Sequence, residues 1–210
     1  MADPILDLIK KGPKPLKSIC YDKSAYDFLN SELLPVLQNY REEAREYCRH
    51  RDLEADKLAS AKNNAEAELK FLFENYPDVE VILMSSVGAN LHLSGTSDID
   101  FGVVVKDLTT DKIETYGTIL TRAGYVPDRE TNGYFPYQKK IFNIDIEAKL
   151  RDLDNSVKII ELHNCLDQLP SETQQLLTYA KSIAYTDKAT YDNFKKIIYS
   201  AYFTEINNFI

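Results

Sequence analysis

The sequence predicts an α+β fold in which a mixed β-sheet carries helices mostly on one face and is flanked by helical segments before and after it. Two short apolar runs, at residues 79–84 and 101–105, have the length and composition of buried strands. A third segment, residues 134–147, contains the alternation of polar and apolar residues that is typical of a strand. At 210 residues and 44% hydrophobic composition, the chain can bury a substantial core.

The chain before the first strand is predicted to be helical. Prolines interrupt the first 20 residues, which we expect to form a short helix and a lysine-rich arm. Residues 24–37 have a helical pattern with a kink or a new start at Pro35. Apolar residues then recur at spacings near 3.6 over residues 38–75, which predicts one long helix. We expect this helix to pack against the sheet rather than to form a coiled coil with a partner.

The remaining elements follow from periodicity and turn residues. They are, in order, a helix at residues 110–123, a short strand around Tyr125, the segment 134–147, and helices from residue 157 onward, with a start at residues 170–172 and a last helix at residues 191–203. Two interpretations of segment 134–147 stay open: one long bent strand, or a hairpin that turns near Lys139 and Lys140.

This order of elements divides the chain into three parts. Residues 1–75 are expected to form an arm and a long helix that packs on the core, residues 76–152 the catalytic core, and residues 153–210 a helical segment. Internal repeats and low-complexity tracts are absent from the sequence.

Acidic residues alternate with apolar residues at two places in the predicted sheet. Asp98 and Asp100 open the second apolar run, and Asp145 and Glu147 alternate with isoleucines in the later segment. Residues i and i+2 of a strand point to the same face, roughly 6.6 Å apart. If the two segments are neighbours, their carboxylates can converge on Mg²⁺ or Mn²⁺, which prefer oxygen ligands. Such clusters support phosphoryl and nucleotidyl transfer by two metal ions.

A turn of small residues connects the first strand to the acidic pair. Ser85, Ser86 and Gly88 lead into a short amphipathic helix expected at residues 89–93. Backbone N–H groups at a helix start favour anions, and small side chains let a phosphate approach. We therefore predict that this turn binds the phosphates of a nucleotide.

The turn and the Asp-x-Asp strand together resemble the DNA polymerase beta superfamily of nucleotidyltransferases, and the likeness extends from residue 79 to residue 147. The pattern is similar to poly(A) and terminal uridylyl transferases and to oligoadenylate synthetases. The resemblance implies that Asp98 and Asp100 bind both metals, that Asp145 binds the catalytic metal and activates the acceptor hydroxyl, and that Ser86 contacts the triphosphate. Glu147 is expected at the surface or as a partner of the site.

Two further positions bear on the resemblance. Ser85 stands where the family has its first turn glycine, and its Cβ can crowd a phosphate. Residues 176–181 resemble a helix of RNA nucleotidyltransferases whose lysine reaches the triphosphate, which implies that role for Lys181; the alternative is an ordinary surface lysine.

The function that these features predict is transfer of a nucleoside monophosphate from an NTP, ATP included, to an acceptor hydroxyl. The acceptor expected first is an RNA 3′ end, extended without a template and with release of pyrophosphate. One alternative is synthesis of oligoadenylate or cyclic dinucleotides from NTPs alone. Another is a degenerate nucleotidyltransferase fold that serves as a binding or scaffold subunit, with the long N-terminal helix as its surface for a protein partner.

Composition excludes several other classes. A net charge of −8 argues against a nonspecific nucleic-acid-binding protein, which needs a basic face. The three cysteines are widely spaced and lack a metal-ligand pattern, which favours free thiols in a reducing compartment. The sequence has neither a recognisable signal peptide nor an apolar run approaching 18 residues. The expectation is a cytoplasmic protein without a membrane partner, a nuclear location also being open.

Overall fold

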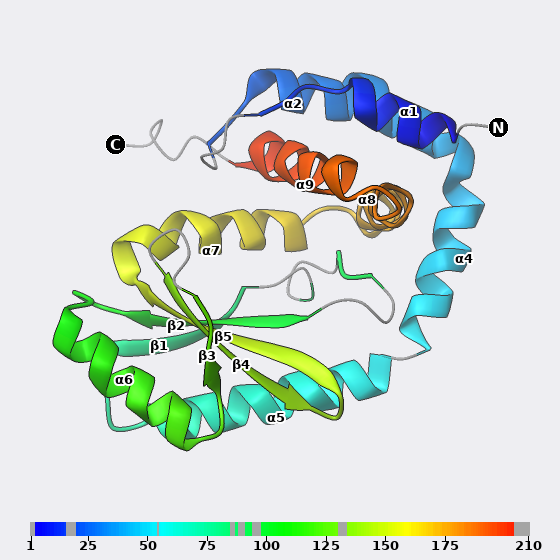
Figure 1. The fold of residues 1–210 in the computed structure, drawn as a ribbon. Coiled ribbons are helices and arrows are strands. Elements are labelled where there is room, and N and C mark those ends of the chain that lie inside the picture. The colour runs from blue at the N-terminus through cyan, green and yellow to red at the C-terminus, as the bar shows by residue number, and fades with distance from the viewer. Residues whose placement is uncertain are drawn as a thin grey trace. The chain divides into compact units, whose positions relative to one another are not determined.

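The computed structural model describes residues 3–15, 20–53, 55–84, 87, 91–93, 98–129 and 134–203, except for the side chain of Asn155. The chain divides into two compact units (Figure 1). One unit combines Met1–Asp52 with Asn164–Ile210, and the other comprises Leu53–His163. The expected division into three consecutive parts therefore differs from this one, because the two ends of the chain form a unit together.

The unit formed by Leu53–His163 contains a five-stranded mixed sheet with the order β1-β2-β5-β4-β3. Strands β2 and β5 are parallel, and the other three neighbouring pairs are antiparallel. The predicted α+β class is confirmed. The strands are β1 (Val79–Leu83), β2 (Ile99–Val105), β3 (Val126–Pro127), β4 (Tyr134–Ile141) and β5 (Ile144–Asp152).

One face of this sheet forms the hydrophobic core. Its side chains come from alternate positions of β2 and β5, and two helices cover it: α5 (Ala55–Leu72) and α6 (Thr110–Arg122) (Figure 1). Full burial of a large aliphatic or aromatic side chain contributes about 1.5–3 kcal/mol, so this alternation fixes which face of each strand is turned inward. The fully buried members include Ile99, Phe101, Val103, Ile146, Ala148 and Leu150, with Ala61, Ala65 and Leu69 of α5 and Leu120 of α6.

The open question about segment 134–147 is answered by a hairpin. Strands β4 and β5 pair from Ile141 and Ile144 outward, so the turn consists of Phe142 and Asn143. Their φ angles are 53° and 65°, as in the two-residue turns that match the twist of antiparallel strands. The expected turn near Lys139 and Lys140 is wrong, since both residues lie within β4.

The other unit is helical. Its elements are α1 (Pro4–Lys11), α2 (Lys23–Phe28), a π-helical turn (Leu29–Leu33), α3 (Leu34–Leu37), a 3₁₀ turn (Gln38–Tyr40), α4 (Arg41–Asp52), α8 (Ser171–Ala184) and α9 (Lys188–Tyr202). Aspartate side chains accept backbone N–H hydrogen bonds at the starts of α1, α2 and α9, as is usual for helix N-caps. Helix α7 (Leu153–Asp167) follows β5 directly.

The prolines act as the sequence predicts. The helical run over residues 24–37 is interrupted by a π-helical turn immediately before Pro35, which lacks the N–H needed for a regular helical bond. Helix α8 begins directly after Pro170. Within the described part of the chain, the helices lack the combined length and apolar character needed to span a membrane.

The single long helix expected at residues 38–75 is two helices. Helix α4 ends at Asp52 and α5 begins at Ala55, and the two belong to different units. Helix α4 packs against α8, whereas α5 packs against β1, β4 and β5. Periodicity alone did not reveal the break, because both helices carry an apolar stripe at the same spacing.

Gly117 gives a first test of this packing. A Cβ at this position of α6 would collide with Oη of the buried Tyr137 in β4. An alanine normally stabilises a helix by up to about 1 kcal/mol relative to glycine. We expect Gly117→Ala instead to lower the free energy of unfolding by about 1–3 kcal/mol, because the core cannot absorb the added atom. Urea unfolding measures the change.

The matched control removes the colliding atom. In Tyr137→Phe the nearest ring atom to that Cβ would be Cζ, at 3.2 Å. Gly117→Ala should therefore cost much less in the Tyr137→Phe background, and the difference is the coupling of a double-mutant cycle. Stabilisation by Gly117→Ala alone would contradict this close packing.

A second test concerns Asp78, which ties the start of β1 to α6. Lys112 Nζ lies 2.8 Å from Asp78 Oδ2, and Tyr116 donates its hydroxyl to both carboxylate oxygens at 3.0 Å. The bond from Lys112, together with that from Tyr116, holds the pKa of Asp78 below its usual value, against the opposing effect of burial. A lowered folded-state pKa stabilises the fold above the unfolded-state pKa, and this contribution is lost as the pH falls through the folded value.

We therefore expect Asp78→Asn to lower the free energy of unfolding by about 1 kcal/mol at pH 7 and by much less near pH 3. Denaturant unfolding at both pH values measures this. Glu66→Gln, which removes the exposed pair of Glu66 and Lys70, is the control and should change stability by less than about 0.5 kcal/mol. An equal loss for Asp78→Asn at both pH values would show that the ionised carboxylate does not stabilise the fold.

Candidate functional site

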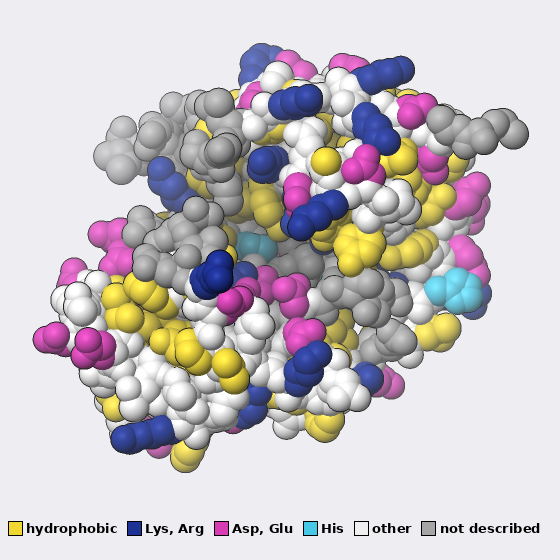
Figure 2. Space-filling model, viewed as in Figure 1, with side chains coloured by type: hydrophobic (Ala, Val, Ile, Leu, Met, Phe, Trp, Pro, Cys, Tyr) yellow, Lys and Arg dark blue, Asp and Glu magenta, His cyan; other side chains and the backbone are white. Residues whose placement is uncertain are grey.

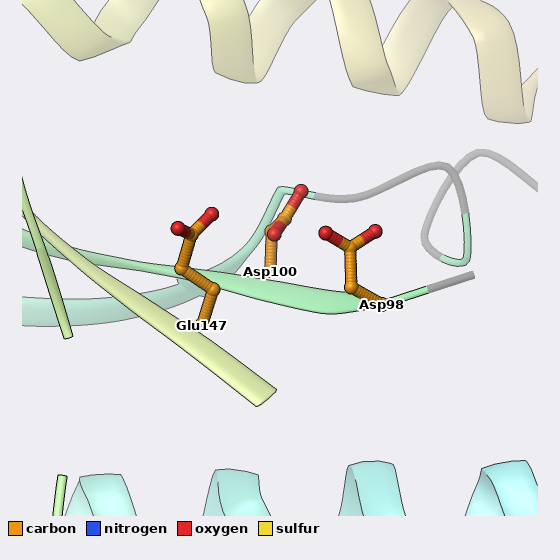
Figure 3. A group of neighbouring side chains, drawn as sticks. All are labelled: Asp98, Asp100 and Glu147. Carbon is orange, nitrogen blue, oxygen red and sulfur yellow. The ribbon is translucent and has the colours of Figure 1, made fainter. Parts of the chain in front are cut away.

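Three carboxylates gather on the face of the sheet opposite its hydrophobic core. They belong to Asp98, just before β2, to Asp100 in β2 and to Glu147 in β5 (Figure 3). Each offers one oxygen atom, and these oxygens all lie within 4.8 Å of one another. Figure 3 shows the three side chains extending from neighbouring strands on one side of the sheet, away from α5.

The register of β2 and β5 produces this convergence. The two strands are parallel, and Asp100 is the direct partner of Glu147. Ile99 and Ile146, one residue earlier on each strand, are partners on the buried face. Because a strand alternates its side chains, burial of the isoleucines turns the neighbouring carboxylates to the other face.

Burial disfavours the charged forms of the carboxylates in this cluster. The side chains of Asp100 and Glu147 are each 17% exposed, whereas Asp98 is exposed. Loss of hydration raises the pKa of Asp100 to about 7, with Asp98 and Glu147 adding to the rise and Lys149 opposing it. One oxygen of Asp100, Oδ1, is buried and accepts no hydrogen bond from the described part of the chain. Buried oxygens of this kind are normally satisfied by a partner.

Lys149 is the nearest cation to the cluster for which the structure gives distances. Its Nζ lies 3.1 Å from Asp100 Oδ2 and 2.9 Å from Glu147 Oε2, and its side chain is 16% exposed. Burial works against the charged ammonium, but the two carboxylates hold the pKa of Lys149 above its ordinary value. The sequence analysis missed this residue, although its position two residues after Glu147 placed it on the same face of the strand.

Arg151 extends this row of charged groups along β5. Its guanidinium carbon lies 5.0 Å from the ring centroid of Tyr134, and Lys149 Nζ lies 5.6 Å from the same centroid. Burial lowers the pKa of Arg151 from its ordinary value. Tyr134 is the cross-strand partner of Arg151 in β4. The polar face of β5 thus presents a carboxylate and then two cations that share one aromatic ring.

The structure brings together Asp98 and Asp100 as the sequence predicted, but the third carboxylate is that of Glu147, not of Asp145. Asp145 lies two residues earlier, near the hairpin turn, where its partner in β4 is Lys140. Lys140 Nζ is 3.1 Å from Asp145 Oδ1, and the Asp145 side chain is 63% exposed. The family pattern favoured Asp145, whereas in the structure Glu147 is the direct partner of Asp100 and Asp145 forms an ion pair with Lys140.

The predicted phosphate-binding residues are not all described. Ser85, Ser86 and Gly88 lie outside the described residues. Of the short helix expected at residues 89–93, the described residues 91–93 are not helical, and Leu91 and Leu93 are buried.

Lys181 belongs to α8 in the other unit. Its side chain is buried, and its Nζ lies 5.9 Å from the ring centroid of Tyr191, so the alternative of an ordinary surface lysine is wrong. Its predicted contact with a triphosphate stays a prediction.

The donor set fits a divalent cation. It consists of three carboxylates, which are the ligands that Mg²⁺ and Mn²⁺ prefer, at separations short enough for shared coordination. A bound cation would also provide a partner for the buried Oδ1 of Asp100. Asp98, Asp100 and Glu147 are therefore the residues that would hold the metal.

Comparison with known proteins gives likeness of structure alone. No protein-family model and no curated protein matches the sequence. Among solved structures, the chain is similar to the Cid1 poly(U) polymerase in its MgGTP-bound form, with 18% identity and a TM-score of 0.55 over 70% of this chain and 48% of that one. It is also similar to a cytoplasmic RNA terminal U-transferase, with 18% identity and a TM-score of 0.52 over 69% of this chain and 45% of that one.

A third similar structure is the STING-associated CdnE c-di-GMP synthase from Capnocytophaga granulosa. It shares 17% identity and a TM-score of 0.51, and the match covers 98% of this chain and 77% of that one. The chain spans about half the length of the uridylyl-transferring enzymes that it matches. These likenesses, together with the mixed sheet and the acidic cluster on its polar face, show that the chain has the nucleotidyltransferase fold.

Proposed function

We propose that this protein is a metal-dependent nucleotidyltransferase, which moves a nucleoside monophosphate from an NTP to an acceptor hydroxyl. The observation that carries the proposal is the convergence of the Asp98, Asp100 and Glu147 carboxylates on the polar face of a nucleotidyltransferase-type sheet. Clustered carboxylates that repel one another are well suited to bind Mg²⁺ or Mn²⁺.

The reaction joins the acceptor to the nucleotide in one displacement. The acceptor oxygen forms a bond to the α-phosphorus, and the bond from that phosphorus to the oxygen bridging to the β-phosphate breaks. The acceptor proton passes to a base, and pyrophosphate leaves. A divalent cation bound at the cluster would stabilise charge on the attacking and leaving oxygens.

Residues of this chain would hold the metal and the phosphates of the nucleotide for this reaction. Asp98 and Asp100 would hold the metal side by side at the start of β2, and Glu147 would take the place that the sequence assigned to Asp145. Ser85, Ser86 and Gly88 are proposed to bind the phosphates through backbone N–H groups and hydroxyls. Lys181 is proposed to contact the β- or γ-phosphate as a point charge.

The acceptor proposed first is a short RNA 3′ end, extended without a template. One neighbour is named as an RNA terminal U-transferase and another as a poly(U) polymerase, which supports an RNA end as the acceptor. The net charge of −8 disfavours long nucleic acids. On the face shown in Figure 2, the described Lys and Arg side chains are interspersed with Asp and Glu, an arrangement that suits a small acceptor.

A second candidate is synthesis of a cyclic dinucleotide or an oligonucleotide from NTPs alone. The observation that favours it is coverage, since the c-di-GMP synthase matches 98% of this chain against about 70% for the uridylyl-transferring enzymes. In that reaction the acceptor hydroxyl belongs to a second nucleotide. Both candidates use the same three carboxylates.

The choice between Glu147 and Asp145 is directly testable. We expect Glu147→Gln, like Asp98→Asn and Asp100→Asn, to lower the rate of pyrophosphate release from NTPs by at least about 100-fold, because each removes several kcal/mol of stabilisation through the metal. Asp145→Asn removes an exposed carboxylate of the same hairpin that forms an ion pair with Lys140, and it should change the rate by less than about threefold. The reverse ranking would return the third position to Asp145.

Metal dependence and the acceptor are tested together. Chelation with EDTA should abolish pyrophosphate release, and added Mg²⁺ or Mn²⁺ should restore it. Without a cation, the negatively charged carboxylates repel the negatively charged triphosphate. The purified protein is incubated with each NTP, with and without a short single-stranded RNA. Mass spectrometry of the products then identifies the acceptor.

An RNA lengthened by single nucleotides is the expected result. A cyclic or linear oligonucleotide formed without RNA would support the second candidate. Absence of turnover, together with absence of metal-dependent NTP binding by calorimetry, would contradict both and favour a scaffold role for the fold.

A further inference from the structure

We propose that Lys149 is a built-in cation of the carboxylate cluster, which competes with divalent metal for Asp100 and Glu147. This inference rests on the proposed function, since it concerns how the same cluster accepts its metal. It makes Lys149 a positioning residue that sets metal affinity, not a group that touches the reacting atoms.

The contacts of the ammonium carry the inference. Lys149 Nζ lies within hydrogen-bond distance of Asp100 Oδ2, at 3.1 Å, and of Glu147 Oε2, at 2.9 Å. Asp100 and Glu147 are also two of the three carboxylates whose oxygens lie within 4.8 Å of one another. A metal held by Asp100 and Glu147 would therefore compete with the ammonium for the lone pairs of the same carboxylates.

The surroundings of Lys149 hold its ammonium at the cluster. Its neighbours on the two adjoining strands are Gly102 in β2 and Pro136 in β4, neither of which offers a polar side chain. The ring of Tyr134 lies 5.6 Å from Nζ, and the side chain is 16% exposed. Because the side chain has little exposure to water, the two carboxylates are the strongest partners that the ammonium contacts.

The charges of the cluster show what this ammonium does. Three ionised carboxylates carry a charge of −3, and one ammonium reduces it to −2, which a single divalent cation neutralises. Removing the ammonium would leave the partly buried carboxylates without the cation that contacts them, which destabilises the metal-free fold and strengthens metal binding. The pair of Lys149 with Asp100 and Glu147 thus stabilises the fold when metal is absent and weakens metal binding.

The test compares Mn²⁺ binding by the full chain with Lys149 present and replaced. Free Mn²⁺ is measured by electron paramagnetic resonance, and the melting temperature is measured without metal and with saturating Mn²⁺. We expect Lys149→Met to bind Mn²⁺ about 10–100-fold more tightly than the unchanged protein, because it removes a positive charge that contacts two of the ligand carboxylates. Its metal-free melting temperature should fall, and Mn²⁺ should raise it by more than in the unchanged protein.

Three further variants keep the test decisive. Lys149→Gln should shift affinity in the same direction and stands in if Lys149→Met fails to fold without metal. Lys149→Arg keeps the charge and should bind Mn²⁺ as the unchanged protein does. Lys140→Met is the matched control, because Lys140 forms a similar ion pair with Asp145 on the same hairpin. The Lys140 side chain is 68% exposed, and this pair lies outside the cluster.

The outcomes separate this inference from the proposed function. Equal or weaker Mn²⁺ binding by Lys149→Met and Lys149→Gln would overturn the role of Lys149 and leave the metal site standing. A gain of the same size in Lys140→Met would also overturn it, because a general charge effect would then be responsible. Absence of Mn²⁺ binding by every variant and by the unchanged protein would overturn the proposed function itself.

Discussion

The parallel pairing of β2 and β5 is the constraint on which the rest of the site depends. Its register joins Ile99 to Ile146 on the core face and Asp100 to Glu147 on the polar face. A shift by one residue would bury the carboxylates and expose the isoleucines, at a cost of several kcal/mol for each misplaced side chain. The same burial of apolar side chains that stabilises the sheet therefore also assembles the acidic cluster.

The cluster is a place where stability and the proposed metal binding oppose each other. Loss of hydration raises the pKa of Asp100 to about 7, and repulsion from Asp98 and Glu147 adds to the rise. A structure selected for stability alone would replace one of these carboxylates with an apolar residue. Their presence together beside Lys149, whose ammonium contacts two of the three, is the pattern expected of a site that receives a cation.

Local signals in the sequence predicted most elements because those elements depend on near neighbours. The apolar runs gave β1 and β2, the prolines marked the kink before Pro35 and the start of α8, and periodicity gave α6. The long helix was wrong for the same reason, since α4 and α5 share one periodicity while packing in different units. Which partner an apolar stripe packs against is not a local property.

The sequence by itself determined that Asp98 and Asp100 share one face, because strand alternation places residues i and i+2 on the same side whatever their surroundings. The likeness of this pair and the turn before it to nucleotidyltransferases was a resemblance. Only the tertiary structure decided that Glu147 completes the cluster, that Asp145 pairs with Lys140, and that Lys149 contacts the carboxylates. Asp145, Glu147 and Lys149 all point to the same face of β5, so alternation cannot choose among them. The pairing of β5 with strands on both sides makes that choice, since Glu147 lies opposite Asp100 in β2 and Asp145 lies opposite Lys140 in β4.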